Sequence, residues 1–104
     1  MFVALWEYEV KPGNVERFEK AYGPDGDWVQ LFRSDTHYYQ TRLVQDSLRR
    51  GVYLTMDFWE SREAYEDFMA GHRKEYEAID AVGEELTVKE RRIGWFEMVD
   101  GSSQ

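Results

Sequence analysis

Four stretches of the chain combine β-branched and aromatic residues with side chains that alternate between two faces, a pattern typical of β-strands. These stretches are residues 2–10, 36–46, 52–59 and 91–99. Only the turn 47–51 separates the second stretch from the third, which predicts a hairpin. Both faces of the stretch 52–59 carry large side chains, so neither face is expected to be simply exposed to water.

Two regions between these strands have apolar residues spaced three and four apart, which predicts helices. In the first region, Asn14 is the expected N-cap of a helix that ends before Gly23 and Pro24. Asp25 or Asp27 is expected to cap a shorter helix that follows directly. This region therefore predicts two consecutive helices rather than one.

The second helical region completes the order of elements. Ser61 is expected to cap a helix that Gly71 interrupts, and a further helical stretch follows over about residues 72–86. The resulting order is β–α–β–β–α–β, which is that of the ferredoxin-like fold. The sequence therefore predicts one α+β domain over residues 1–104 with an antiparallel sheet, and residues 101–104 are expected to form a flexible tail.

Aromatic residues are unusually frequent in this chain of 104 residues. It contains four Trp, seven Tyr and six Phe, which together make up 16% of the sequence. A domain of this size buries a modest share of its surface, and so many rings are more than one small core easily holds. The surplus predicts a ligand pocket, an interface between subunits, or both.

The net charge and the residue types argue against several classes of binding partner and against a metal site. A net charge of −8 argues against nucleic acid and against anionic membrane surfaces as partners. The chain has no cysteine, and its two histidines lack a metal-binding spacing, so no metal site is expected. No apolar run approaches the roughly 20 residues needed to span a bilayer, and residues 1–10 lack the basic start of a secretory signal. We therefore expect a cytoplasmic protein.

Three segments together resemble one protein family. They are residues 10–28 (VKPGNVERFEKAYGPDGDW), residues 53–80, which include a Trp-Glu-Ser turn followed by a Glu-Ala-aromatic helix, and residues 90–97 (ERRIGWFE). In order and spacing they are similar to the antibiotic biosynthesis monooxygenase (ABM) family. The resemblance implies a dimeric α+β barrel, in which two protomers pair their sheets face to face. Pairing would also cover the sheet face that helices leave bare, so a homodimer is expected.

The resemblance also implies a range of functions, because a fold does not fix an activity. Members of the family include oxygenases that act without a cofactor on small aromatic or quinol-like molecules, and we expect no cofactor here. The alternatives are a non-catalytic small-molecule-binding or dimerisation module and a non-oxygenase enzyme of the isomerase type. Haem-degrading members have an Asn, a Trp and a His at positions where this chain has Trp6, Phe68 and Ala78, so haem degradation is not expected.

Five residues are candidates for a site that binds and deprotonates an aromatic molecule. His72 is the possible catalytic base, since imidazole titrates near neutral pH, although it also fits a solvated helix cap. Trp59 is a possible pocket wall or a packing residue, and Tyr76 is a possible hydrogen-bond donor to the substrate. His37 and Arg42 are further substrate-binding candidates, with a strand end and an ion pair as their structural alternatives.

Overall fold

The computed structural model of the protein describes residues 1–99 and contains one antiparallel sheet with four helices on one of its faces. The strand order is β2-β3-β1-β4, so β1 and β3 are central and β2 and β4 are edges. The elements in chain order are β1 (Phe2–Val10), α1 (Val15–Tyr22), α2 (Asp27–Phe32), β2 (Tyr38–Gln45), β3 (Val52–Trp59), α3 (Arg62–Gly71), α4 (Arg73–Leu86) and β4 (Thr87–Glu97). The predicted α+β, ferredoxin-like fold is confirmed.

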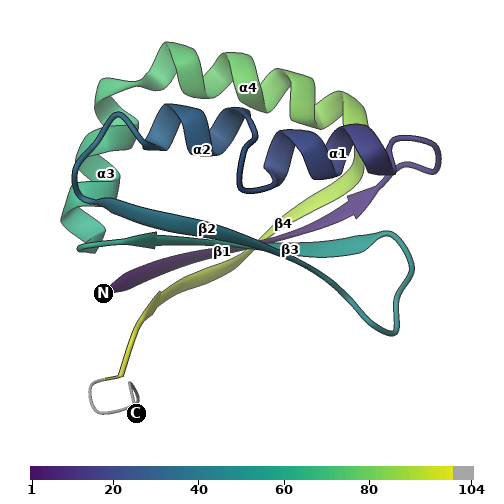
Figure 1. Cartoon of the computed structure of the whole chain (residues 1–104), viewed down its shortest axis with the longest axis horizontal. Helices are drawn as coiled ribbons and strands as arrows, with labels where there is room; N and C mark the ends of the chain where they lie inside the picture. Colours follow the sequence, from purple (N-terminus) through teal and green to yellow (C-terminus); the bar gives the residue numbers. More distant parts are fainter. Residues whose placement is uncertain (100–104) are drawn as a thin grey trace.

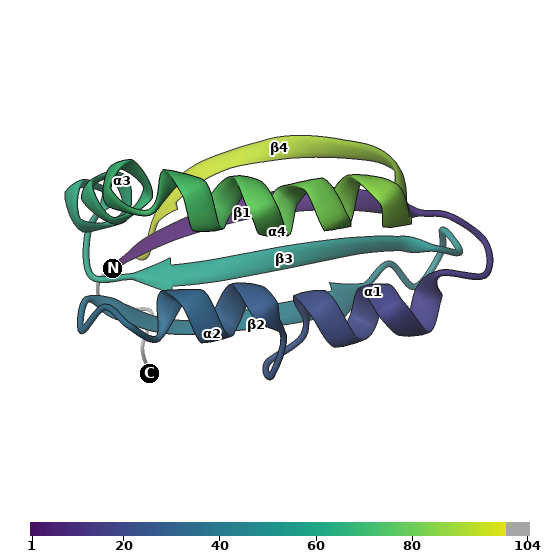
Figure 2. The same cartoon turned by 90° about the horizontal axis from the view of Figure 1, so that it is seen from above.

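The helices form a single layer over the sheet (Figure 1). Seen from above, α1 and α2 follow one another along one side of the sheet, and α4 runs beside them (Figure 2). Helix α3 lies at the end of the sheet where the N-terminus also lies. No helix within residues 1–99 covers the opposite face of the sheet, and none is both long and apolar enough to cross a bilayer.

The observed strand bounds differ from the predicted ones mainly at β4. This strand begins at Thr87, directly after α4, whereas the sequence predicted a start at residue 91. No glycine or proline separates the two elements, so the sequence carries no turn signal there. The pairing of Val10 with Thr87 extends the ladder to the last residue of β1, which explains the earlier start. The expected tail at 101–104 lies outside the described residues.

Two of the three predicted N-cap positions are correct, and one of these two residues makes a capping hydrogen bond. The Ser61 hydroxyl accepts a hydrogen bond from the Ala64 backbone N–H at 3.1 Å, as expected. Asn14 occupies the N-cap position of α1, but within residues 1–99 its side chain makes no capping hydrogen bond. The N-cap of α2 is Gly26, not an aspartate. A Cβ atom at Gly26 would lie 2.1 Å from the Ala21 carbonyl oxygen, so only glycine fits this close approach.

The core between the sheet and the helices is built mainly of aromatic rings. On β3, one face of the strand (Tyr53, Thr55, Asp57 and Trp59) points toward the helices, because these residues are opposite core residues of β1. Burying a large apolar side chain stabilises a fold by about 1.5–3 kcal/mol, and rings from every helix contribute. The fully or nearly fully buried aromatic residues are Phe2, Tyr8, Phe18, Tyr22, Trp28, Phe32, Tyr53, Trp59, Tyr65 and Phe68.

Candidate functional site

A small internal cavity lies between the centre of the sheet and the helix layer. Its volume is about 30 Å³, enough for one or two water molecules. Its walls are mostly rings, and its polar groups are hydroxyls and carboxyls, with no basic side chain from residues 1–99 in the lining. The lining residues are Trp6, Tyr8, Tyr22, Trp28, Phe32, Thr41, Thr55, Asp57, Tyr65, Met69, Tyr76, Asp80 and Glu90.

Asp57 is the most unusual group in this cavity. It sits on the central strand β3, on the face that the helices cover, and only 8% of its surface is exposed. Thr41 of the neighbouring strand β2 donates a hydrogen bond from Oγ1 to Asp57 Oδ1 at 2.6 Å. Burial raises the pKa of Asp57 from 3.8 to about 6, and the Thr41 hydrogen bond opposes part of that rise. The carboxyl can therefore exchange a proton near neutral pH.

Two further carboxyls reach the same cavity from other elements. Burial raises the pKa of Asp80 on α4, and the neighbouring Glu84 adds to the effect. Burial also raises the pKa of Glu90 on β4, with Asp80 and Glu84 as further causes. No group of three or more potential metal ligands forms within residues 1–99. The cavity is thus an acidic, ring-walled space in which a neutral hydroxyl group is a better partner than an anion.

An open groove of about 500 Å³ adjoins the internal cavity. Four residues (Trp6, Tyr65, Met69 and Tyr76) line both spaces, so they form the partition between them. The volume of the groove falls within the range of small-molecule sites.

The rim of this groove carries charges of both signs. Arg73 of α4 and Arg92 of β4 line it, together with Glu66, Glu77 and Trp95. The Trp95 ring is flanked by two guanidinium groups, with the Arg62 Cζ at 4.3 Å and the Arg92 Cζ at 4.8 Å from its centroid. Trp95 Nε1 is buried and has no hydrogen-bond partner among the described residues. The groove therefore combines an aromatic wall with two arginines and two glutamates.

One of the five candidates from the sequence lines both the internal cavity and the groove, and two others lie close to these two spaces. Tyr76 lines the cavity and the groove. Trp59 is fully buried in the core, packed on Phe68, and lines neither space. His72 joins α3 to α4; its ring stacks on Phe68 at 4.0 Å, and its Nδ1 donates to the Phe68 carbonyl at 2.9 Å. His72 is absent from both linings.

The other two candidates lie away from the cavity. His37 is exposed, and its Nδ1 donates to Asp35 Oδ1 at 2.8 Å, which raises the pKa of the imidazole. Arg42 pairs with Met56 across β2 and β3, and it is therefore on the sheet face that no helix covers. The sequence reasoning did not select Asp57. The available signal was a carboxylate that alternates with Tyr53 and Trp59 on one strand face.

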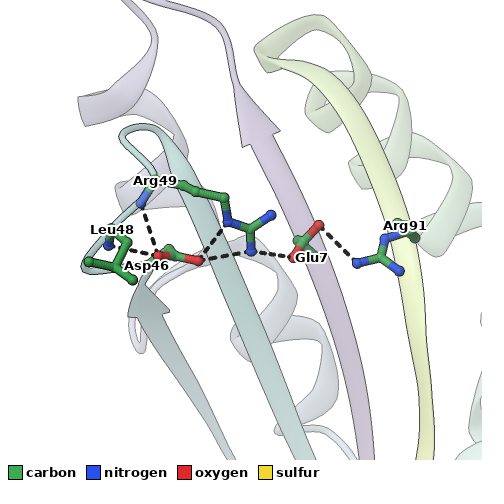
Figure 3. Close-up of polar contacts among 5 residues, drawn as sticks. All are labelled: Glu7, Asp46, Leu48, Arg49 and Arg91. Carbon is green, nitrogen blue, oxygen red and sulfur yellow. Dashed lines mark hydrogen bonds and ion pairs between the residues drawn. The ribbon is translucent and has the colours of Figure 1, made fainter.

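The uncovered face of the sheet carries an apolar surface and a charged network. The apolar side chains are Val3, Leu5, Val44, Val52, Leu54, Met56, Phe58 and Phe96. Glu7 lies on the same face of β1 and accepts hydrogen bonds from Arg49 at 2.9 Å and from Arg91 at 3.3 Å (Figure 3). Arg49 also binds Asp46 beside the β2–β3 turn. The Arg49 and Arg91 contacts keep the pKa of Glu7 below its usual value.

Comparison with known proteins agrees with this architecture. The family model for antibiotic biosynthesis monooxygenases matches residues 1–79, and the chain belongs to this family. No curated protein sequence matches the chain significantly.

Solved structures similar to this chain show the same fold at low sequence identity. A candidate antibiotic biosynthesis monooxygenase from Nitrosomonas europaea superimposes with a TM-score of 0.73 and 12% identity, over 95% of this chain and 99% of that one. SnoaB, a cofactor-independent oxygenase from Streptomyces nogalater, superimposes with a TM-score of 0.68 and 15% identity, over 99% and 97% of the two chains. A conserved protein from Methanosarcina mazei Go1 superimposes with a TM-score of 0.70 and 13% identity, over 94% of this chain and 92% of that one.

Proposed function

We propose that the protein is a cofactor-independent oxygenase of a small planar phenol, anthrone or quinol-like molecule, with Asp57 as the base. The observation that supports this most is a carboxyl buried among rings, with a pKa raised to about 6 and no basic side chain from residues 1–99 in its cavity. A general base works best when its pKa is close to the working pH. Similarity in fold to the oxygenase SnoaB supports the same reaction class.

In this proposal the substrate ring lies in the groove against Trp6, Tyr65 and Tyr76, and its acidic O–H or C–H group points into the internal cavity. Met69 lies on the partition and has a flexible side chain, so it can move to widen the opening. Asp57 removes the proton, and the resulting anion transfers electrons directly to O2. One oxygen atom enters the substrate, and the other leaves as water after the peroxide intermediate is protonated. Tyr76 donates a hydrogen bond to the anion.

The test is oxygen uptake by the purified protein, without added cofactor, on a panel of anthrones, hydroquinones and naphthols. We expect Asp57→Asn to reduce the rate by about 10²–10⁴-fold, the usual contribution of a positioned base. Asp67→Asn makes the same chemical change on the exposed side of α3 and should leave the rate unchanged. His72→Ala is measured alongside, because uptake that depends on His72 and not on Asp57 would refute the assignment.

A non-catalytic small-molecule-binding module is the second candidate, and the small size of the internal cavity favours it. At about 30 Å³ the cavity has room for one or two water molecules and none for an aromatic ring. A module of this kind would raise its melting temperature with a ligand from the same panel while consuming no oxygen. An isomerase-type enzyme would convert its substrate at a rate independent of oxygen, which anaerobic assays distinguish.

We also propose that two copies pair through the uncovered face of the sheet. Large apolar side chains are exposed there, including Phe96 at 47% and Val44 at 39%. Exposed apolar patches of this kind are typical of subunit interfaces. Two antiparallel sheets related by a twofold axis would cover both patches at once.

The pairing is tested by analytical ultracentrifugation of Phe96→Glu. A charge buried without a partner in an apolar interface should shift the protein from dimer to monomer. Leu48→Glu is the matched control, because Leu48 is 93% exposed at the β2–β3 turn, off the sheet face. If wild-type protein sediments as a monomer, or if both variants remain dimers, this mode of pairing is excluded.

A further inference from the structure

Two hydroxyl groups connect the buried Asp57 to the surface of the protein. Thr41 Oγ1 donates its only hydrogen to Asp57 Oδ1 at 2.6 Å. The Tyr38 hydroxyl lies 2.8 Å from the same Thr41 oxygen. Because the hydrogen of Thr41 is already used, Tyr38 must be the donor in the second bond. The three groups form one continuous chain of hydrogen bonds that runs from Tyr38 through Thr41 to Asp57.

An irregularity in strand pairing brings the two hydroxyls to the same face of β2. In a regular strand, residues 38 and 41 would point to opposite faces, since side chains alternate. Here Tyr38 pairs with Trp59 and Thr41 pairs with Asp57, and the register shifts between Tyr38 and Gln40. The bulged strand thus has one extra residue over this interval. Both hydroxyls consequently point toward the helix layer and can hydrogen-bond to each other.

The outer end of this chain opens on a surface depression of about 260 Å³. Tyr38 and Thr41 both line the depression, and Thr41 also lines the internal cavity. Thr41 is therefore the wall between the cavity and the solvent on the β2 edge. The groove described above opens on the β4 side of the cavity, so a molecule bound there would leave the β2 side free.

We propose that Tyr38 and Thr41 form a proton relay between Asp57 and solvent in the surface depression. A hydronium ion in the depression gives a proton to the Tyr38 oxygen and leaves as water, while Tyr38 passes its own proton to Thr41 and Thr41 passes its proton to Asp57 Oδ1. One proton enters and one is delivered, the negative charge of the carboxylate is neutralised, and no electrons are transferred. Run in the opposite direction, after both hydroxyls rotate, the chain returns to solvent the proton that Asp57 takes from a substrate.

The surroundings of Asp57 favour proton transfer through Thr41 over transfer through the other titratable groups near the carboxyl. The charged or titratable groups around it come from several of the elements that line the cavity. They are Tyr8 of β1, Tyr22 of α1, Tyr38 of β2, Tyr65 of α3, Tyr76 and Asp80 of α4, and Glu90 of β4. Among the described residues, Thr41 is the one side chain that makes a hydrogen bond to the Asp57 carboxyl. The inference extends the proposed function, in which Asp57 is the base, but it requires no substrate to be tested.

The experiment follows protonation of Asp57 by time-resolved infrared spectroscopy after a rapid drop from about pH 8 to about pH 5, on either side of its titration. Asp57→Asn identifies the carboxylic acid band that belongs to Asp57. We expect Thr41→Val and Tyr38→Phe to slow the appearance of this band by about tenfold or more. This is less than the roughly 10²–10⁴-fold that a positioned acid or base contributes to catalysis. Thr41→Ser keeps the hydroxyl and should protonate Asp57 at the fast rate of the wild type. If Thr41 acted only through packing, loss of its methyl group would not leave the rate of Thr41→Ser faster than that of Thr41→Val.

Tyr39→Phe is the matched control for Tyr38→Phe, because Tyr39 is the neighbouring tyrosine and is 53% exposed. It should leave the rate unchanged. The relay is refuted if Thr41→Val or Tyr38→Phe protonates Asp57 as fast as the wild-type protein, or if no band disappears in Asp57→Asn. A fast relay in a protein that consumes no oxygen on any phenol would instead refute the proposed function alone.

Discussion

Replacing Asp57 by Asn should stabilise the protein above pH 7 although the side chain is buried. Asn has the shape of the protonated acid and carries no charge, so it avoids the cost of burying a carboxylate. In the folded protein the pKa of Asp57 is raised from 3.8 to about 6. Each pKa unit corresponds to about 1.36 kcal/mol, so ionised Asp57 costs the fold about 3 kcal/mol.

The sign of the pH dependence follows from proton binding. Between the unfolded pKa near 3.8 and the folded pKa near 6, the folded state binds more protons than the unfolded state. Stability contributed by the neutral acid is therefore present at low pH and is lost as pH rises through this window. The difference in unfolding free energy between Asp57→Asn and the wild type should grow by about 2.5 kcal/mol from pH 4 to pH 8, since part of the total is already present at pH 4.

The assay is urea unfolding of both proteins at pH 4, 6 and 8, at one fixed protein concentration because dimerisation would shift apparent stability. Taking the difference between the proteins removes most of the contribution of the other carboxyls, and Asp67→Asn serves as an exposed control. A difference that changes by less than about 1 kcal/mol over this range would refute the raised pKa and weaken the case for Asp57 as a base.

Two further predictions concern local packing and capping. Gly83→Ala should destabilise the protein by about 1–3 kcal/mol in thermal unfolding, since the new Cβ would lie 1.9 Å from the buried Tyr22 hydroxyl. Gly71→Ala, with no atom within 4 Å of its added Cβ, should be neutral or stabilising, and equal losses in both variants would contradict the clash. Ser61→Ala should cost about 1 kcal/mol of unfolding free energy through loss of its cap, whereas Asn14→Ala should cost less because its side chain makes no capping bond within residues 1–99. Equal losses at the two caps would refute that reasoning.

The local pattern of the sequence was enough to predict the type and order of the elements. Alternation on β1 and β3, the break at Gly71 and the Ser61 cap are set by side chains close to one another along the chain. Such short-range preferences can be read without knowing what packs against an element. Where a boundary depended on a partner strand, as at Thr87 of β4, the prediction missed it by four residues.

The site itself was decided by the tertiary structure. Alternation shows that Asp57 shares a strand face with Tyr53 and Trp59, but it does not show that helices cover this face, and that cover is what raises the pKa of the carboxyl. Likewise, a strict two-residue period puts Tyr38 and Thr41 on opposite faces. The register shift against β3 puts them on one face, and a shift of this kind depends on the partner strand. The sequence by itself determined which elements form and in what order, whereas burial, register and the meeting of distant side chains required the packed sheet and helices.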